Sequence, residues 1–342
     1  MAGVATTMAP PTYGSFSEAL EDLVVMAQRT LQVCLGSAPV HSVSDPGPLR
    51  SIRLWSLYDA VPLMVLIVLL FLLVQAFEFL GQAVGYMCRL HESKQARFKE
   101  SFSELLYSSM SIFVALRVAG IKTSWLWPSG WNEVMHDGRN QLAAGLLPYT
   151  VPAEIKFYYM MELGWYSSSL LKVLVSRRKK DFFEMLTHHL VTSLLLGLSL
   201  ATGYLRIGMV VLLLHNAFDP FLHLAKCTKY LEVPLVPDVA FALCAATFFV
   251  SRLILYPQAI YAAWSGVCTG VETCPGGVWD KTPVEFSLLG LLAALLPIHC
   301  LWFNMILKVL RKALLKSSVQ GDVREDTDSD EDDSDSRKRK DE

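Results

Sequence analysis

Charged residues are scarce in this chain: only 18% of its 342 residues are Asp, Glu, Lys or Arg, whereas 53% are hydrophobic. Ordinary soluble domains carry about 25% charged residues, because water must solvate their surfaces. The scarcity of charge therefore excludes an ordinary soluble domain and indicates a protein that crosses a membrane several times.

Several local signatures are also missing. The N-terminus has no basic segment followed by a short apolar core and a small-residue cleavage site, so we expect no cleavable signal peptide. The seven cysteines include no CxxC spacing of the kind that binds metals, and the sequence shows no N-glycosylation sequon. It also shows no internal repeat, which argues against a transporter built from inverted repeats.

Long apolar stretches are what the chain has instead. Seven of them approach the ~20 residues that a helix needs to cross the hydrocarbon of a bilayer. They lie at 62–80, 104–121, 151–175, 184–203, 206–224, 236–263 and 285–307. The stretch 151–175 is the most polar, because Glu162 and Lys172 interrupt it, and such a helix lines the interior of a bundle. We expect an all-α polytopic fold of about seven transmembrane helices around a lipid-accessible polar site.

The basic residues in the loops predict the orientation of these helices. One set of alternate loops holds Arg89, Lys94, Arg97, Lys99, Arg177, Arg178, Lys179, Lys180, Lys226, Lys229, Lys308, Arg311, Lys312 and Lys316, and the other holds only Lys122, Arg139, Lys156, Arg206 and Lys281. Because basic loops stay in the cytosol, the first set should be cytosolic. We therefore expect a lumenal N-terminal segment (1–60) with an amphipathic helix at 16–34, a transmembrane domain (61–316) and a cytosolic C-terminus.

Two terminal features extend this prediction. Residues 317–342 are acidic with almost no apolar residue, so we expect a disordered cytosolic tail. Its last residues place Lys338 and Lys340 as in a dibasic endoplasmic reticulum retrieval signal, and Thr327 and Ser329 precede acidic residues as kinase sites do. On the lumenal side, Cys268 and Cys274 share one loop, where an oxidising compartment could join them; the sequence leaves this pairing open.

Two adjacent histidines, His188 and His189, begin the apolar run of 184–203. His189 lies 15 residues before Tyr204 in the turn that follows, and Asp219 lies 15 residues after it. At ~1.5 Å per residue both are roughly 22 Å from the turn, so a helical hairpin brings them to one depth. The same arithmetic adds His215 and Asn216 to this layer, with His215 and Asp219 four residues apart on one helix face.

A carboxylate at membrane depth costs ~2.5–3.5 kcal/mol and persists mainly where it is paired or functional. Asp219 facing an imidazole would fix the tautomer of the ring and raise its basicity. Two alternatives remain open at this point. The polar layer could only join two helices, or His188, His189, His215 and His223 could hold a metal, although adjacent helical residues point about 100° apart.

The motifs also carry a resemblance. The stretch "RRKKDFFEMLTHHLVTSLLLGLSLATGYLRIGMVVLLLHNAFDPFLHLAKCTKY" resembles the signature region of the ceramide synthases within the wider TLC-domain family. The similarity includes the His188–His189 pair and Thr192, and continues through "ARFKESFSELLY" and "SRLILYPQ", so that it covers about residues 90–335. Two positions depart from the family pattern, because Asn216 and His223 stand where an aspartate and a glutamate are usual. The homeobox-like insert of some animal members is absent.

The resemblance implies an enzyme of the endoplasmic reticulum membrane that transfers a fatty acyl group from acyl-CoA to a sphingoid base. It implies catalytic roles for His188, His189, His215 and Asp219, with no metal or other cofactor. Residues implied to bind substrates are Asn216, Thr192, Arg177, Arg178, Lys179, Lys180 and Lys226. Its partners would be acyl-CoA, the sphingoid base, membrane lipids and, in a homo- or heterodimer, family members, with no nucleic acid.

Two mechanisms and a rival function stay open from the sequence. A histidine could deprotonate the ammonium of the amine substrate, or it could first accept the acyl group itself. Asn216 cannot act as a base, which shifts the carboxylate role to Asp219 and predicts that Asn216→Asp keeps or raises activity. The rival function is a non-catalytic TLC-domain protein that binds or senses lipid.

Overall fold

The structure, a computed structural model, describes residues 16–38, 52–53, 60–120, 126–133, 150–175, 181–266 and 283–316. Its α-helices are α1 (Phe16–Cys34), α2 (Ala60–Met87), α3 (Glu92–Ala119), α5 (Ala153–Val175), α6 (Phe182–Thr202), α7 (Leu205–Asn216), α8 (Asp219–Tyr230), α9 (Val236–Phe248), α10 (Tyr256–Gly266) and α11 (Pro283–Lys316). A 3₁₀ helix, η3 (Pro128–Glu133), and a π-helical segment, η4 (Phe249–Leu255), join them. Two-residue strands, β1 (Ile52–Arg53) and β2 (Thr150–Val151), pair antiparallel.

The all-α polytopic class is confirmed. Six segments of the described chain are long and apolar enough to cross a membrane: Val61–Met87, Glu92–Ala119, Phe182–Thr202, Leu205–Tyr230, Val236–Ser265 and Pro283–Lys312. The seventh expected span is present as the helix α5, but it is not among these six, and its sequence includes Glu154, Lys156, Glu162 and Lys172. The helix α5 packs against α6, α2 and α3, and Glu154, Lys156 and Glu162 are buried there, whereas Lys172 is exposed.

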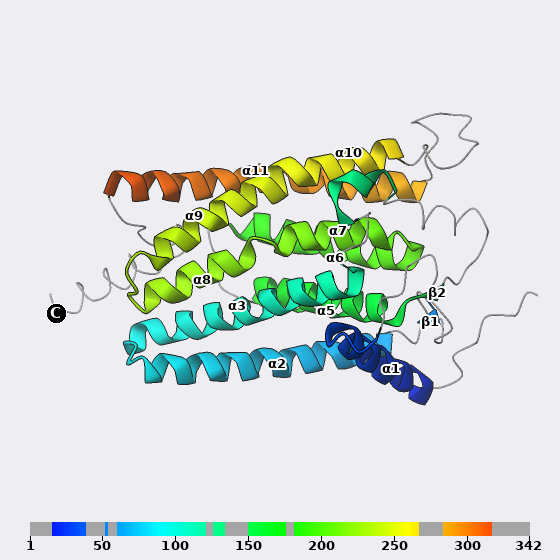
Figure 1. Cartoon of the computed structure of the whole chain (residues 1–342), viewed down its shortest axis with the longest axis horizontal. Helices are drawn as coiled ribbons and strands as arrows, with labels where there is room; N and C mark the ends of the chain where they lie inside the picture. The colour runs from blue at the N-terminus through cyan, green and yellow to red at the C-terminus, as the bar shows by residue number, and fades with distance from the viewer. Residues whose placement is uncertain are drawn as a thin grey trace, which may run out of the picture.

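The helices run side by side along the long axis of the molecule (Figure 1). The α2–α3 and α8–α9 connections lie at one end together with the last turns of α11, and the α6–α7 turn and the β1–β2 pair lie at the other (Figure 1). The basic loops predicted the same grouping of connections, and the cytosolic location of the first end stays a prediction. The segment boundary predicted at residue 60 stays a prediction, because α1 of the N-terminal segment packs against α5, α3 and α2 of the transmembrane domain. The boundary predicted at residue 316 also stays a prediction, because residues 317–342 lie outside the described part.

Two spans expected as single helices are interrupted. The span 206–224 divides into α7 and α8 at Ala217 and Phe218, because Pro220 follows in the first turn of α8 and has no amide hydrogen to continue the helical ladder. The span 236–263 includes the π-helical η4, in which hydrogen bonds join residues five apart. Both interruptions lie beside the polar layer described below.

A close contact between α5 and α7 fixes the hairpin of α6 and α7. The Tyr159 hydroxyl donates a hydrogen bond to the carbonyl oxygen of Leu205 at 2.8 Å, and the Ser199 hydroxyl donates to that of Tyr204 at 2.6 Å. A side chain at Gly208 would collide with the Tyr159 hydroxyl, so this approach requires glycine. The contact sets the depth at which α6 and α7 present their polar residues.

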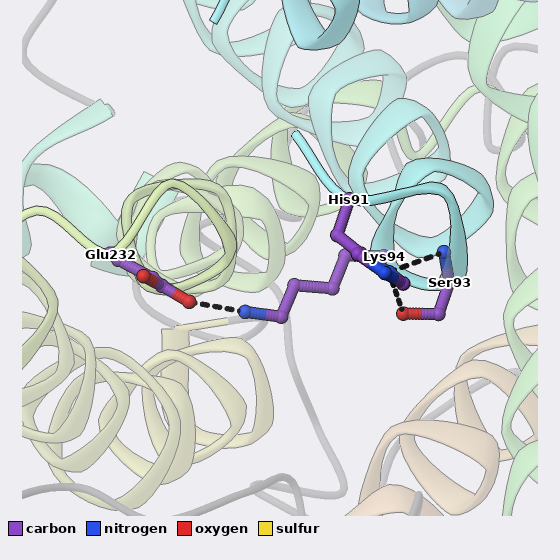
Figure 2. A network of polar contacts seen from close by, with 4 residues as sticks. All are labelled: His91, Ser93, Lys94 and Glu232. Atoms are coloured by element: carbon purple, nitrogen blue, oxygen red, sulfur yellow. Dashed lines mark hydrogen bonds and ion pairs between the residues drawn. The ribbon is translucent and has the colours of Figure 1, made fainter. Parts of the chain in front are cut away.

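At the opposite end, a salt bridge joins the start of α3 to the connection after α8. Lys94 Nζ lies 2.5 Å from Glu232 Oε1, and the His91 side chain caps α3 by accepting from the Ser93 backbone amide at 3.3 Å (Figure 2). Glu232 has a left-handed backbone with φ of 56°, a conformation that favours glycine. The Lys94 ammonium lowers the pKa of the Glu232 carboxyl by a hydrogen bond and by charge attraction.

Candidate functional site

A cavity of about 420 Å³ lies among α3, α5, α6, α8, α9 and α11. Residues on its wall include His188, His189, Asn216, Asp219, Glu162 and Tyr166. The depth arithmetic from the sequence is therefore right for four of these residues, which the two sides of the hairpin bring to one cavity. The polar helix α5 supplies Glu162 and Tyr166, as expected of a wall of the site.

The His188 and His189 rings are buried, with 5% and 9% of their surfaces exposed, but both border this cavity. Their ring centroids lie 5.4 Å apart. The centroid of the Tyr166 ring lies 6.2 Å from that of His188 and 5.9 Å from that of His189. The Nδ1 atom of each ring has no hydrogen-bond partner among the described residues. Each ring therefore has one nitrogen that the described residues leave without a hydrogen bond.

His215 occupies a different environment. It does not line the large cavity but a pocket of about 30 Å³, together with Thr192 and apolar residues of α6, α7 and α11. Its Nε2 lies 3.1 Å from His299 Nε2, and its Nδ1 lies 2.9 Å from the carbonyl oxygen of Val211. Sequence reasoning grouped His215 with His188 and His189 and did not identify His299.

These two contacts assign the tautomers of the His215–His299 pair. A carbonyl oxygen can only accept, so His215 carries its proton on Nδ1 and donates it to Val211. The Nε2 atom of a neutral His215 then accepts, and His299 Nε2–H donates to it. A neutral His215 therefore has no free ring nitrogen. Its ring lies nearly parallel to that of His188, at 17° and 6.1 Å between centroids, so we assign His215 to positioning His188.

The helix α11 supports both rings of this stack from one side. His299 holds His215, and Trp302, one turn further along α11, meets the His188 ring edge-on at 4.9 Å. His299 is fully buried. A lone histidine in an apolar run, two residues after the helix-internal Pro297, was the signal in the sequence.

Arg252 lies in the π-helical segment η4 and is buried. Its Nη2 donates to the carbonyl oxygen of His215 at 2.6 Å, where α7 is about to end. The rings of Phe218 and Phe248 lie 4.7 and 5.4 Å from the guanidinium carbon, distances at which the aromatic faces attract a cation. Within the described chain, its Nη1 has no hydrogen-bond partner, and the side chain borders the large cavity.

Asp219 begins a helix beside the cavity, and its pairing with an imidazole stays a prediction. The interruption before α8 makes it the first residue of a new helix. The Nδ1 atoms of His188 and His189 lack any hydrogen bond to a described residue, and both nitrogens of His215 are bonded elsewhere. Asp219 and Arg252 attract each other electrostatically. In this geometry Asp219 balances the charge of Arg252 and borders the cavity.

Asn216 belongs to a hydrogen-bond network around Glu162. Its Nδ2 donates to Glu162 Oε2 at 3.3 Å and to Ser111 Oγ at 2.9 Å, and its Oδ1 accepts from the Tyr166 hydroxyl at 3.3 Å. The Ser111 hydroxyl donates to Glu162 Oε1 at 2.7 Å, and the Tyr107 hydroxyl lies 3.4 Å from the same atom. An amide suits this position because it donates to a carboxylate and accepts from a phenol at once.

Charged residues border the cavity near the predicted cytosolic end. Lys226 is on its wall, as expected of a substrate-binding residue, and so are Arg97, Lys172 and His223. Lys172 Nζ lies 2.6 Å from Glu100 Oε1. The basic run Arg177 to Lys180 and the Cys268–Cys274 loop lie outside the described residues. In the described part of the chain, no three His, Cys, Asp or Glu residues are arranged to hold a metal ion.

Comparisons with known proteins agree with the resemblance in the sequence. The family model described as "TLC domain" matches residues 97–308. The chain is 31% identical to Ceramide synthase LOH2 of Arabidopsis thaliana over 243 residues, covering 69% of this chain and 76% of that protein. It is 32% identical to ASC1-like protein 3 of Oryza sativa subsp. japonica, covering 70% and 80%, and 30% identical to Ceramide synthase 4 of Homo sapiens, covering 52% and 44%.

Proposed function

Because this chain belongs to the TLC domain family, in its ceramide synthase group, we propose that it transfers a fatty acyl group from acyl-CoA to the amine of a long-chain, sphinganine-like base, forming (dihydro)ceramide. The observation that carries this proposal is the His188–His189 pair on the wall of a cavity enclosed by the bundle, with Nδ1 of both rings free of described partners. Both substrates carry lipid chains, which suits a reaction site at membrane depth.

The chemistry needs a proton acceptor. The amine arrives mostly as an ammonium, and only its neutral form can attack the thioester carbonyl carbon. A histidine first takes one proton from the ammonium and passes it to solvent. The neutral amine then forms the C–N bond, the C–S bond breaks, and a second proton from the nitrogen goes to the sulfur, so that CoA leaves as the thiol. His188 and His189 are the rings suited to this role. The alternative route, transfer of the acyl group first to one of these rings, uses the same nitrogens.

Arg252 gives this mechanism a second element. Negative charge develops on the thioester oxygen as the nitrogen attacks, and a buried cation that borders the cavity would stabilise it. The Nη1 group of Arg252 has no described partner and is the group proposed for this task. Phe218 and Phe248 hold the guanidinium in place.

The charged wall of the cavity suits the polar part of acyl-CoA. Arg97, Lys172 and Lys226 border the cavity on the segments of α3, α5 and α8 nearest the predicted cytosolic end. We propose that the anionic CoA head enters there and that the basic run Arg177 to Lys180, which follows α5 in the sequence, also binds it. Thr192 lines the small apolar pocket together with Tyr166 and His215, and we propose that it contacts the substrate. With this placement we propose a lumenal N-terminus, a cytosolic C-terminus, residence in the endoplasmic reticulum membrane and a reaction that needs no metal or other cofactor.

The proposal is tested by expressing the full chain in cells that lack their own ceramide synthases and measuring ceramides by mass spectrometry. We expect ceramide to appear with the wild-type chain and to be absent with a variant carrying His188→Ala and His189→Ala that accumulates equally. If the wild-type chain accumulates in the membrane without ceramide, the proposal fails. Long-chain lipid that copurifies with such an inactive chain would favour the lipid-binding alternative.

A further inference from the structure

Glu162 is a buried carboxylate whose hydrogen-bond partners carry no positive charge. It lies near the middle of α5 with 0% of its surface exposed, and it borders the large cavity. Its oxygens accept from Ser111, Asn216 and Tyr107, all of them neutral donors. In the described part of the chain, no Lys, Arg or His lies within ion-pair distance of it.

Other carboxylates of the same cavity have cations nearby. Glu100 pairs with Lys172 at 2.6 Å, and Asp219 is attracted by Arg252. Glu162 differs from them in being both deeper and without such a charge. A buried carboxylate without a counter-charge is unfavourable, and a ligand that brings a cation to it gains what the protein itself does not supply.

On the basis of the proposed N-acylation, we propose that Glu162 binds the ammonium group of the amine substrate. The ammonium would donate to Glu162 Oε1, where the Tyr107 contact is long at 3.4 Å and is readily exchanged. Binding there would make the enzyme selective for an amine over an alcohol of the same shape, because only the ammonium compensates the negative charge of the carboxylate.

The network around Glu162 connects this site to the histidines. Asn216 donates to Glu162 and accepts from Tyr166, whose ring faces both His188 and His189. Tyr107 stacks on Trp165 with centroids 3.5 Å apart, which makes a rigid aromatic wall beside the carboxylate. A substrate held by its ammonium at Glu162 thus lies on the same side of the cavity as the rings that receive its proton.

The test compares the binding of a cation with that of a neutral molecule of the same shape. The full chain and its Glu162→Gln variant are placed in lipid nanodiscs, and the dissociation constants are measured for a long-chain sphingoid base and for its analogue with a hydroxyl in place of the amine. We expect the wild type to bind the amine more tightly than the neutral analogue. Glu162→Gln should raise the dissociation constant of the amine by about tenfold or more, because a charge-assisted hydrogen bond is lost. The neutral analogue should bind both proteins equally.

Two further variants keep the result interpretable. Glu104→Gln removes another carboxylate of the same cavity and should leave the preference for the amine unchanged. Glu162→Asp keeps the charge and should restore part of the preference. Equal losses for amine and neutral analogue in Glu162→Gln, or no loss for either, would overturn the ammonium site. Binding is measured without turnover, so the two proposals fail separately. A chain that forms no ceramide would overturn the proposed function, whereas the ammonium site is judged by the binding measurements alone.

Discussion

Two pairs of histidines lie next to each other in this bundle, and they differ in what their nitrogens do. His188 and His189 border the large cavity, and their Nδ1 atoms have no described partner. His215 and His299 are bonded to each other, and His215 is bonded to Val211 as well. The first pair borders the cavity and can meet a bound molecule there, whereas His215 and His299 do not line that cavity, and both ring nitrogens of His215 are already bonded.

The comparison shows that proximity alone does not identify a reactive histidine. His188 and His215 are stacked at 6.1 Å, so both belong to one layer, yet only one of them reaches the cavity. What separates them is the number of ring nitrogens that the protein itself uses. This criterion requires side-chain positions, which a motif does not provide.

The largest effect is expected from the cavity pair. We predict that His188→Ala and His189→Ala each lower N-acyltransferase activity by about 100-fold or more, the range typical of a lost proton-transfer group. Activity is measured in membranes from cells without endogenous ceramide synthases, using a labelled sphingoid base. Protein level and membrane insertion serve as the control. If either single variant keeps wild-type activity at an equal protein level, that ring does not take part in the reaction.

An intermediate effect is expected at Asn216, and here the structure reverses the expectation from the motif. Asn216→Asp places a second carboxylate 3.3 Å from Glu162 and removes the amide that donates to it. Like charges at this distance force one of the two groups to take up a proton. We therefore predict that Asn216→Asp lowers both activity and thermal stability, by about 1–3 kcal/mol in the free energy of unfolding.

The double variant Asn216→Asp with Glu162→Gln exchanges the amide and the carboxylate, so it should recover most of the lost stability. Thermal unfolding of the wild type, the two single variants and the double variant measures this coupling. Additive losses in the double variant would contradict the hydrogen bond. Unchanged or increased activity in Asn216→Asp alone would contradict this prediction and support the expectation from the sequence that the substitution keeps or raises activity.

The smallest effect is expected far from both histidine pairs, at Glu232. Its φ of 56° is strained for a glutamate, while its Lys94 partner is exposed and contributes little. Glu232→Gly relieves the backbone and loses the ion pair, whereas Glu232→Ala only loses the pair. We predict that the melting temperature of Glu232→Gly stays close to that of the wild type and that Glu232→Ala melts lower; the reverse order would refute this account.

The same pair predicts a pH dependence. Lys94 lowers the pKa of Glu232, so the contribution of the pair is complete above the ordinary carboxyl pKa and is lost as pH falls through the lowered value. The difference in melting temperature between wild type and Glu232→Ala should therefore be seen at neutral pH and shrink in acid. A difference that grows in acid would contradict this sign.

The class of fold and half of the site were predictable because they depend on regular helix geometry. Apolar length gave the spans, and the equal rise of two antiparallel helices placed His188, His189, Asn216 and Asp219 at one depth. The interruption of the second helix was not predicted, although Pro220 could have indicated it. Because of this interruption, His215 lies near the end of α7 and Asp219 at the start of α8.

The rest of the site was not predictable because it comes from helices that no short turn connects to the motif. His299 is on α11 and Arg252 is on η4, and only the packing of these segments brings both to His215. A π-helical segment has no distinct apolar period, so the position of Arg252 could not be read from spacing. The polarity of Glu162 is evident in the sequence, but its network with Asn216 and Ser111 depends on how α3, α5 and α7 pack.

The most direct test of the division between reacting and positioning histidines is one matched substitution at two positions. Asparagine keeps an N–H donor but cannot accept a proton, so His299→Asn can still donate to His215, whereas His189→Asn cannot act as a base. With kcat/KM for the sphingoid base measured side by side, the account predicts that His299→Asn keeps activity within about tenfold of the wild type and His189→Asn loses about 100-fold or more. Equal losses at the two positions, or a larger loss at His299, would contradict it.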